Sequence, residues 1–323
     1  MVELRDIEAA AERLAPVAVE TPLLHSPALD EVAGGTVYIK PENLQVTGSF
    51  KFRGAYNMMS QLTQEEAKHG AVAFSSGNHA QAVAASGAML GIETTIVMPK
   101  DAPAIKIENT RRLGGNTILY DRYNEDRVAI ARKIAAEKGS VVVPAFDHEH
   151  IIAGQGTAGL ELMRQCGELG VTPDQVLVNC SGGGLTAGVA IAVKALSPDT
   201  CVYPVEPQDF DDTARSLKSG QRETNDPAAR SICDALQTES PGEITFSINR
   251  ELLSPGLVVS DDEVKDAIRF AFRHLKLVAE PGGSASLAAV LSGKLDTRDK
   301  ITVIILSGGN IDVEMFASIQ KGD

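Results

Sequence analysis

The stretch "QVLVNCSGGGLTAGVAIAVKAL", residues 175–196, decides the fold class. Its apolar start at 175–180 is typical of a buried strand, and the apolar run after residue 184 has a helical pattern. Ser181 and three consecutive glycines, 182–184, join the two. Glycines at a strand-to-helix turn let successive backbone N–H groups point at an anion, and the helix N-terminus adds partial positive charge. Because a tight turn alone needs fewer glycines, the pattern predicts a phosphate site.

The same succession of strand and helix recurs along the chain. Further apolar runs that belong to it lie at 71–74, 94–99, 116–120, 201–206 and 300–306. This alternation indicates parallel sheet with helices on its faces. No flexible linker separates two halves, so we expect any second domain to be folded into the first. Between about residues 215 and 255 the pattern is lost, and we expect long surface loops there.

Composition and charge exclude several classes of protein. The 323 residues are 43% hydrophobic and 23% charged, as in ordinary globular proteins. A net charge of −13 argues against sequence-independent binding to nucleic acid or anionic membranes. No apolar run is long enough to span a bilayer, the N-terminus lacks a signal-peptide pattern, and the four cysteines have no pairing or metal-ligand spacing. We expect a reduced, cytoplasmic protein that binds a small molecule.

A second glycine-rich stretch, "GQGTAG" at 154–159, fits the GxGxxG spacing of dinucleotide-binding turns. The residues before it make a poor buried strand, and no acidic residue stands convincingly at the ribose-binding position. We therefore reject a dinucleotide site and predict a helix start that tolerates glycine.

A lysine between two aromatic residues stands in "TGSFKFRGAYN", residues 47–57. Lys51 lies between Phe50 and Phe52, and two interpretations are open. It is either a surface lysine whose stem covers apolar rings, or a partly desolvated lysine whose neutral amine can attack a carbonyl. This stretch alone favours the surface lysine.

Two further strand ends carry polar side chains. The stretch "SSGNHAQ", 75–81, offers hydroxyls, an amide and an imidazole at a helix N-terminus, which suits a carboxylate or phosphate. Helix capping by Ser76 or Asn78 is the simpler alternative. The stretch "LSGGN", 306–310, ends the last apolar run with Ser307, and it is either a ligand-facing strand end or a plain turn.

Taken together, "ENLQVTGSFKFRGA", "SSGNHAQ", "SGGGL" and "LSGGN", in this order and spacing, resemble the fold-type-II pyridoxal-phosphate (PLP) enzymes. More narrowly, they resemble the serine/threonine dehydratase and serine racemase branch, and the likeness covers essentially the whole chain. It implies a tryptophan-synthase-β-like α/β fold with two open, mostly parallel sheets flanked by helices. The expected large domain comprises 1–52 and 146–323, a small domain at 53–145 is inserted in it, and the assembly is a homodimer.

The resemblance also implies roles around the cofactor. Lys51 would be the Schiff-base lysine and would later take the α-proton of the substrate, while Phe50 would pack against the cofactor ring. Asn78 would hydrogen-bond the phenolic oxygen of PLP. Ser307 would face the pyridine nitrogen, and a serine there makes the ring a weaker electron sink, which suits elimination over transamination. The backbone N–H groups expected to hold the phosphate belong to Ser181, Gly182, Gly183, Gly184 and Leu185.

The activity implied by the resemblance is β-elimination. The substrate would be a 3-hydroxy amino acid such as L-threonine or L-serine, the products a 2-oxo acid and ammonia, and Ser75, Ser76 and His79 would receive its carboxylate. One alternative is a serine racemase, because Ser76 could be the second catalytic acid/base on the face opposite Lys51. A 3-hydroxyaspartate dehydratase or racemase, from the same group of relatives, is the other. A non-catalytic binding protein on the same scaffold is disfavoured by the presence of Lys51.

A metal site is implied by the stretch "EPQDFDD", 206–212, which resembles the divalent-cation site of the racemase-like members. The ligands would be Glu206, the carbonyl group of Phe210, and Asp212. Such all-oxygen ligation suits Mg²⁺ or Ca²⁺, whereas an ordinary acidic loop is the alternative.

The chain departs from the family pattern at two places. Ala235 follows Asp234, where related enzymes commonly have glycine, and "EPGGSA" at 280–285 differs from the more usual Glu-Pro-Ser/Ala-Gly-Ala. Both departures bear on the size or orientation of the substrate.

Overall fold

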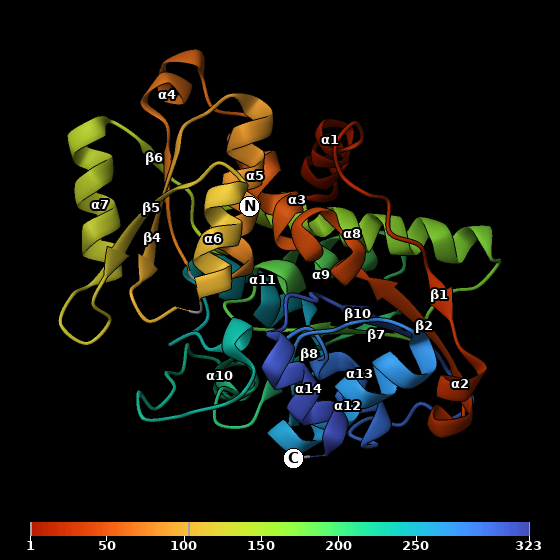
Figure 1. Cartoon of the computed structure of the whole chain (residues 1–323). Helices are drawn as coiled ribbons and strands as arrows, with labels where there is room; N and C mark the ends of the chain where they lie inside the picture. Colours follow the sequence, from red (N-terminus) through yellow and green to blue (C-terminus); the bar gives the residue numbers. More distant parts are fainter. Residues whose placement is uncertain (1, 76, 103, 323) are drawn as a thin grey trace.

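The computed structural model describes residues 2–75, 77–102 and 104–322, and it contains two sheets (Figure 1). The larger sheet has six strands in the order β1-β2-β10-β7-β8-β9. The pair β1–β2 is antiparallel and the other neighbours are parallel, as the strand–helix alternation predicts. The bounds of these strands are β1 Leu24–His25, β2 Thr36–Pro41, β7 Gln175–Asn179, β8 Cys201–Pro207, β9 Leu257–Val259 and β10 Ile301–Leu306.

The six-stranded sheet is buried on both faces. Because side chains alternate along a strand, Leu177 and Ile304 face one apolar cluster, and Val176 and Val303 face another. The first cluster includes side chains of α2 (Pro27–Ala33), α12 (Asp261–Phe270) and α13 (Ala285–Leu291), and the second those of α8 (Glu149–Glu168) and α9 (Gly184–Leu196). This two-sided burial explains why the strands read as continuous apolar runs.

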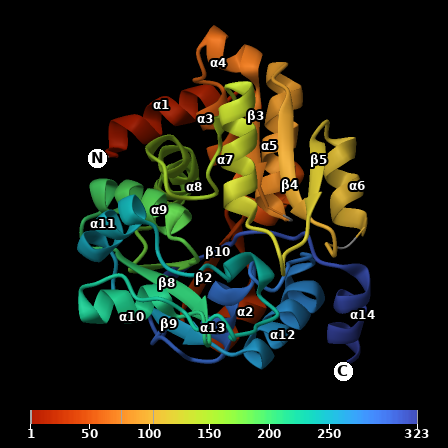
Figure 2. The same ribbon diagram turned by 90° about the vertical axis from the view of Figure 1, so that its left-hand side faces the viewer.

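The second sheet has four parallel strands in the order β5-β4-β3-β6. Val72 and Val97 pack against α7, whereas Ala73 and Ile96 face the cluster that includes α5 and α3. Figure 2 shows α7 in front of this sheet and α5 behind it. The bounds are β3 Ala71–Phe74, β4 Thr94–Pro99, β5 Asn116–Tyr120, β6 Val141–Val142, α3 Lys51–Met59, α5 Asn78–Leu90, α6 Ala104–Arg112 and α7 Arg127–Lys138.

The expected surface loops between about 215 and 255 are only partly present. Residues 220–242 contain one short 3₁₀ turn, Asp234–Leu236, but α11 (Glu243–Leu252) is a helix that the sequence analysis missed. Its first N–H groups, from Glu243 to Thr245, donate to the carboxylate of Asp147, which lies far away in the sequence. No local capping residue signals this helix start, because a tertiary contact supplies the cap. The remaining helices are α1 Leu4–Leu14, α4 Gln64–His69, α10 Asp212–Ser219 and α14 Val313–Lys321.

The stretch at 154–159 lies inside α8, so the predicted helix start there is wrong. Its glycines serve close packing between helices. A Cβ at Gly154 would lie 2.6 Å from the carbonyl oxygen of Arg53 in α3, and a Cβ at Gly156 would lie 2.9 Å from that of Gly188 in α9. The rejection of a dinucleotide turn agrees with this position, because the glycines do not follow a strand.

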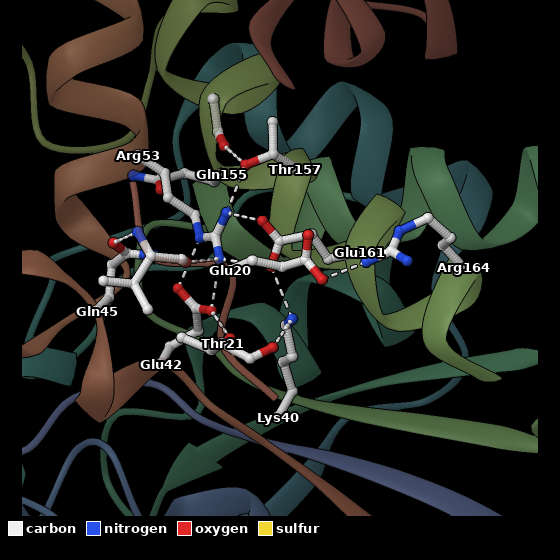
Figure 3. A network of polar contacts seen from close by, with 12 residues as sticks. Glu20, Thr21, Lys40, Glu42, Gln45, Arg53, Gln155, Thr157, Glu161 and Arg164 are labelled. Atoms are coloured by element: carbon white, nitrogen blue, oxygen red, sulfur yellow. Dashed lines mark hydrogen bonds and ion pairs between the residues drawn. The ribbon is translucent and has the colours of Figure 1, made fainter. Parts of the chain in front are cut away.

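A buried cluster of charges joins α3 to β2 and α8 (Figure 3). Arg53 Nε donates to Glu42 at 2.7 Å and Arg53 Nη1 donates to Glu161 at 2.6 Å. Lys40 Nζ donates to the other oxygen of Glu161 at 2.7 Å, and Thr21 Oγ1 donates to Glu42 at 2.7 Å. Because Arg53, Lys40 and Glu42 are fully buried, each charge depends on its partners, and the cluster fixes the start of α3.

Candidate active site

A cavity of about 210 Å³ opens where the carboxyl ends of strands from both sheets meet. Ligands of open α/β sheets bind at such strand ends. The structure brings the predicted cofactor and substrate residues together in the wall of this cavity, except Ser76, which lies outside the described residues. The predicted metal ligands do not line the cavity. The predicted residues that line it are Phe50, Lys51, Ser75, Asn78, His79, Ser181, Gly182, Gly183, Gly184, Leu185 and Ser307.

Lys51 is the first residue of α3, and its amine is in the cavity wall. Nζ donates to the carbonyl oxygen of Ala145 at 2.7 Å and lies 5.1 Å from the centre of the Phe50 ring. Burial lowers the pKa of Lys51 to about 8, although the carboxylate of Glu280 acts in the opposite direction. The neutral form, which a nucleophile or base requires, is therefore far more populated near neutral pH than in an ordinary lysine.

The glycine turn between β7 and α9 has no room for side chains. A Cβ at Gly182 would lie 2.4 Å from the ring of Phe146, and one at Gly183 would lie 2.6 Å from Asn249 Nδ2. Gly183 also has φ = 92°, in the left-handed region that favours glycine.

The same turn directs its carbonyl groups away from the cavity. Thr245 Oγ1 donates to the carbonyl oxygen of Gly182 at 2.6 Å, and Thr186 Oγ1 donates to that of Gly183 at 2.9 Å. The first N–H groups of α9 have no partner within the helix, and they are available to an anion in the cavity. This cradle fits a phosphate group.

The start of α5 supplies the polar side chains of the opposite wall. His79 Nε2 lies 2.9 Å from the carbonyl oxygen of Val143, so the ring donates there. Burial, with a contribution from the positive charge of Lys51, lowers the pKa of His79 to about 3. The imidazole is therefore neutral. Ser75 Oγ accepts from the N–H of Gly77 at 3.2 Å, which leaves its hydroxyl hydrogen for a ligand.

Ser307 is held by Asn179, a residue that the sequence analysis missed. Asn179 Nδ2 donates to Ser307 Oγ at 3.0 Å and to the carbonyl oxygen of Gly283 at 2.7 Å. The oxygen of the same amide accepts from the backbone and the hydroxyl of Ser286. Because Ser307 Oγ accepts from Asn179, its own hydrogen can be donated into the cavity. A polar residue that ends an apolar strand is the signal that points to Asn179.

Two cations on the wall of the cavity were also missed. Lys106 in α6 and Arg127 in α7 line it, and the Lys106 ammonium is paired with Asp234 at 2.8 Å. Arg127 lies 5.9 Å from the centre of the Phe74 ring, and among the described residues no Asp or Glu side chain forms an ion pair with it. Neither residue carries a sequence signal, because both look like ordinary charges on exposed helices.

The predicted metal ligands lie outside the lining of the cavity. Glu206 and Asp212 are fully buried, and burial raises the pKa of both, that of Asp212 to about 6. Glu206 accepts from two N–H groups at the start of α10, and Asp212 Oδ1 accepts from Asn225 at 2.6 Å. Asp212 Oδ2 is buried and has no hydrogen-bond partner among the described residues. Phe210 is buried beside them, but the described residues contain no group of three or more His, Cys, Asp or Glu side chains that could hold a metal.

Comparisons with known proteins agree with this geometry. The family described as "Pyridoxal-phosphate dependent enzyme" matches residues 14–308. The L-threo-3-hydroxyaspartate ammonia-lyase of a Pseudomonas species is 45% identical over 98% of each chain. The L-threonine ammonia-lyase of Thermotoga maritima is 41% identical over 99% of this chain and 78% of that protein. The solved structure of maize serine racemase superposes with a TM-score of 0.92 at 35% identity, covering 99% of this chain and 98% of that one.

Proposed function

Because the chain belongs to the pyridoxal-phosphate-dependent enzyme family, we propose that it catalyses β-elimination of a 3-hydroxy amino acid such as L-threonine or L-serine. The products are a 2-oxo acid and ammonia. The observation that carries the proposal is that one cavity holds both a lysine of lowered pKa, Lys51, and a glycine turn that fits a phosphate. A phosphate-bearing aldehyde is the ligand that needs both.

The residues around the cavity fit PLP. The backbone of 181–185 would hold its phosphate, Phe50 would lie against the ring, and Ser307 would donate to or accept from the pyridine nitrogen. When bound, PLP supplies an aldehyde that reacts with amines and a ring that withdraws electrons from the α-carbon of the substrate. Lys51 Nζ would be the amine that holds it, since its lowered pKa leaves the amine partly neutral.

Lys51 also suits the proton transfer. With cofactor and substrate bound, the neutral Nζ would be the base that accepts the proton from the α-carbon. The β-hydroxyl group would leave as water with a proton from an acid in the cavity, and hydrolysis of the released enamine would give the 2-oxo acid and ammonia. The N-terminus of α5, with the Ser75 hydroxyl, would receive the α-carboxylate of the substrate. The neutral His79 ring gives its one N–H to the carbonyl group of Val143, so it has no N–H left to donate to this carboxylate.

A specific observation favours 3-hydroxyaspartate as a second candidate substrate. Arg127 presents a guanidinium at the cavity that pairs with no carboxylate among the described residues, whereas Lys106 is already paired. A substrate with a second carboxylate would supply that partner, and threonine or serine would not. The 45% identical Pseudomonas relative is an L-threo-3-hydroxyaspartate ammonia-lyase. The racemase alternative requires Ser76 as the second acid/base. Because Ser76 lies outside the described residues, racemisation stays a prediction.

One experiment tests these assignments together. Purified, PLP-loaded protein is incubated with L-serine, L-threonine and L-threo-3-hydroxyaspartate in turn, and 2-oxo acid, ammonia and the D-enantiomers are measured in each sample. We expect 2-oxo acid and ammonia in equal amounts, and none from Lys51→Ala. A D-amino acid that forms faster than 2-oxo acid would mean that the protein is a racemase and not a lyase.

We also propose a divalent-cation site at Glu206, Asp212 and the carbonyl group of Phe210. Two neighbouring buried carboxylates are costly unless a cation or protons compensate them, and the unpartnered Oδ2 of Asp212 is a free ligand atom. Mg²⁺ or Ca²⁺ should raise the melting temperature of chelator-treated protein and should have no effect on Asp212→Asn. An unchanged melting temperature in the wild type would remove the metal from the proposal.

The homodimer remains part of the proposal as well. The partner would be a second copy of this chain, and light scattering of the PLP-loaded protein would give its mass. A mass near the 34.1 kDa of one chain would contradict it.

A further inference from the structure

Three side chains from distant parts of the chain are joined by successive hydrogen bonds along one wall of the cavity, and we call this series the relay. Asn310 Nδ2 donates to Asn78 Oδ1 at 2.7 Å, and Asn78 Nδ2 donates to Glu280 Oε1 at 2.5 Å. All three residues line the cavity, and Asn78 and Glu280 are buried. None of these contacts involves a residue that holds the glycine turn, so the relay is structurally separate from the expected phosphate site.

The direction of the relay is fixed at its outer end. Asn310 Nδ2 also donates to the carbonyl oxygen of Thr47 at 2.8 Å, and a backbone carbonyl can only accept. The amide of Asn310 must therefore turn its nitrogen toward Asn78, which in turn must present its oxygen. This leaves Asn78 Nδ2 facing Glu280, with one hydrogen given to Oε1 and a second hydrogen still available.

Close packing holds Glu280 in place. The N–H of Glu280 donates to the carbonyl oxygen of Gly308 at 3.1 Å. A Cβ at Gly308 would lie 2.2 Å from Glu280 Oε1 and 3.1 Å from Asn78 Nδ2. A Cβ at Gly283 would lie 2.2 Å from the carbonyl oxygen of Gly308. The second glycine of "EPGGSA" and the first of "LSGGN" are thus the residues that let this carboxyl group reach Asn78.

We propose that Glu280 and Asn310 are positioning residues that hold the Asn78 amide with its nitrogen toward the ligand, so that the second Nδ2 hydrogen is donated to an acceptor oxygen of the cofactor. The proposal rests on the proposed function only in that the cavity binds PLP, whose phenolic oxygen is such an acceptor. A donor at this oxygen favours its ionised form. Burial and the nearby Asp234 raise the pKa of Glu280 to about 8, which agrees with a carboxyl group that acts through hydrogen bonds more than through charge.

The decisive variant is Asn310→Asp. It keeps the size of the side chain but removes both N–H donors, so Asn78 Oδ1 loses its partner and the amide is free to flip. In PLP-loaded protein we expect a shifted visible absorption band, a changed pH titration of that band, and a dissociation constant for PLP raised about tenfold, as for one hydrogen bond to a charged group. Asn124→Asp on an exposed loop makes the same change of charge and should alter none of the three.

A second pair of variants guards against a misfolded protein. Glu280→Gln retains an oxygen that can accept from Asn78 and should keep the wild-type band, whereas Glu280→Ala should behave like Asn310→Asp. Melting temperatures of the cofactor-free variants show whether they fold. A wild-type band in Asn310→Asp, or a Glu280→Gln variant as altered as Glu280→Ala, would overturn the relay. Wild-type protein that binds PLP but eliminates no substrate would instead contradict the proposed function and leave the relay standing.

Discussion

The Lys51 amine and the Ala145 carbonyl oxygen are joined by a 2.7 Å hydrogen bond between two residues 94 positions apart. Lys51 begins α3, while Ala145 follows the last strand of the four-stranded sheet. The contact therefore links the two ends of the segment 53–145, which we propose as the inserted small domain. A hydrogen bond to a carbonyl uses one hydrogen of the amine and leaves the lone pair of the neutral form for the cavity.

The pKa of Lys51 sets a pH dependence for the loading of cofactor-free protein. Burial lowers this pKa to about 8, so the neutral amine increases as the pH rises toward that value and little is gained beyond it. The rate of PLP attachment, followed by visible absorption, should rise about tenfold per pH unit below 7 and level off above about 8. Lys51→Ala should acquire no band that borohydride reduction fixes to the protein. A rate that is flat between pH 6 and 9 would contradict the lowered pKa.

Burial of Lys51 also makes the free energy of unfolding depend on pH. The folded protein disfavours the charged amine, so this group lowers the free energy of unfolding fully below about pH 8, and the penalty disappears as the pH rises toward the ordinary lysine value. Urea titrations of wild type and Lys51→Met at pH 7 and pH 9.5 should show a smaller gain from the substitution at the higher pH.

The glycine turn predicts a site-specific loss of phosphate affinity. In Gly182→Ala the added methyl group would lie 2.4 Å from the Phe146 ring, and overpacking of this kind costs about 1–3 kcal/mol. Since the turn must move to relieve the contact, the dissociation constant for PLP should rise at least about tenfold, measured by equilibrium dialysis of the cofactor.

Gly167→Ala is the matched control for this change. A Cβ at Gly167, near the end of α8, meets no atom of the described residues within 4 Å, and alanine favours helix. Its affinity for PLP and its melting temperature should equal or exceed those of the wild type. Equal affinities in both variants would argue against a cradle at 181–185.

The buried charge cluster predicts a large loss of stability in Arg53→Met. The substitution leaves Glu42 and Glu161 without their shared partner, and breaking a buried pair costs about 3–5 kcal/mol. Urea denaturation of the cofactor-free protein measures the free energy of unfolding. Arg5→Ala removes an exposed arginine paired with Glu3 and should change it little. If both variants lost the same amount, the cluster would not be what fixes the start of α3.

Much of the site could be predicted because the sequence pattern shows where strands end and helices begin. The glycines 182–184, Lys51 and Ser307 stand at strand ends or helix starts, and parallel strands bring such points to one edge. The resemblance to fold-type-II PLP enzymes and the α/β class are confirmed by the family match and by the likeness to maize serine racemase. The roles of single residues, the domain bounds, the dimer and the cytoplasmic location stay predictions.

The missed residues are those whose partners are far away in the sequence. Asn179 and Asn310 act through side-chain amides whose orientation depends on tertiary partners, and Glu280 stood in a motif to which only an effect on the substrate was assigned. Helix α11 was missed because Asp147 caps it from outside. Lys106 and Arg127 gave no signal in the sequence, because a helix whose charged side chain faces a cavity has the same hydrophobic pattern as a helix whose charged side chain faces water. A membrane-spanning helix is not found among the described residues.

Arg127 gives the sharpest prediction about the substrate. If its guanidinium pairs with a second carboxylate, Arg127→Met should lower kcat/KM for L-threo-3-hydroxyaspartate about tenfold to hundredfold, as expected for hydrogen bonds between charged groups. For L-serine and L-threonine, which have no second carboxylate, the change should stay within about threefold. Arg127→Lys should recover only part of the loss, because an ammonium cannot make the two parallel contacts of a guanidinium. Arg132→Met, on the same helix but outside the cavity lining, is the matched control. Equal losses for all three substrates would mean that Arg127 supports the fold of the cavity mouth, and the preference for a dicarboxylic substrate would have to be dropped.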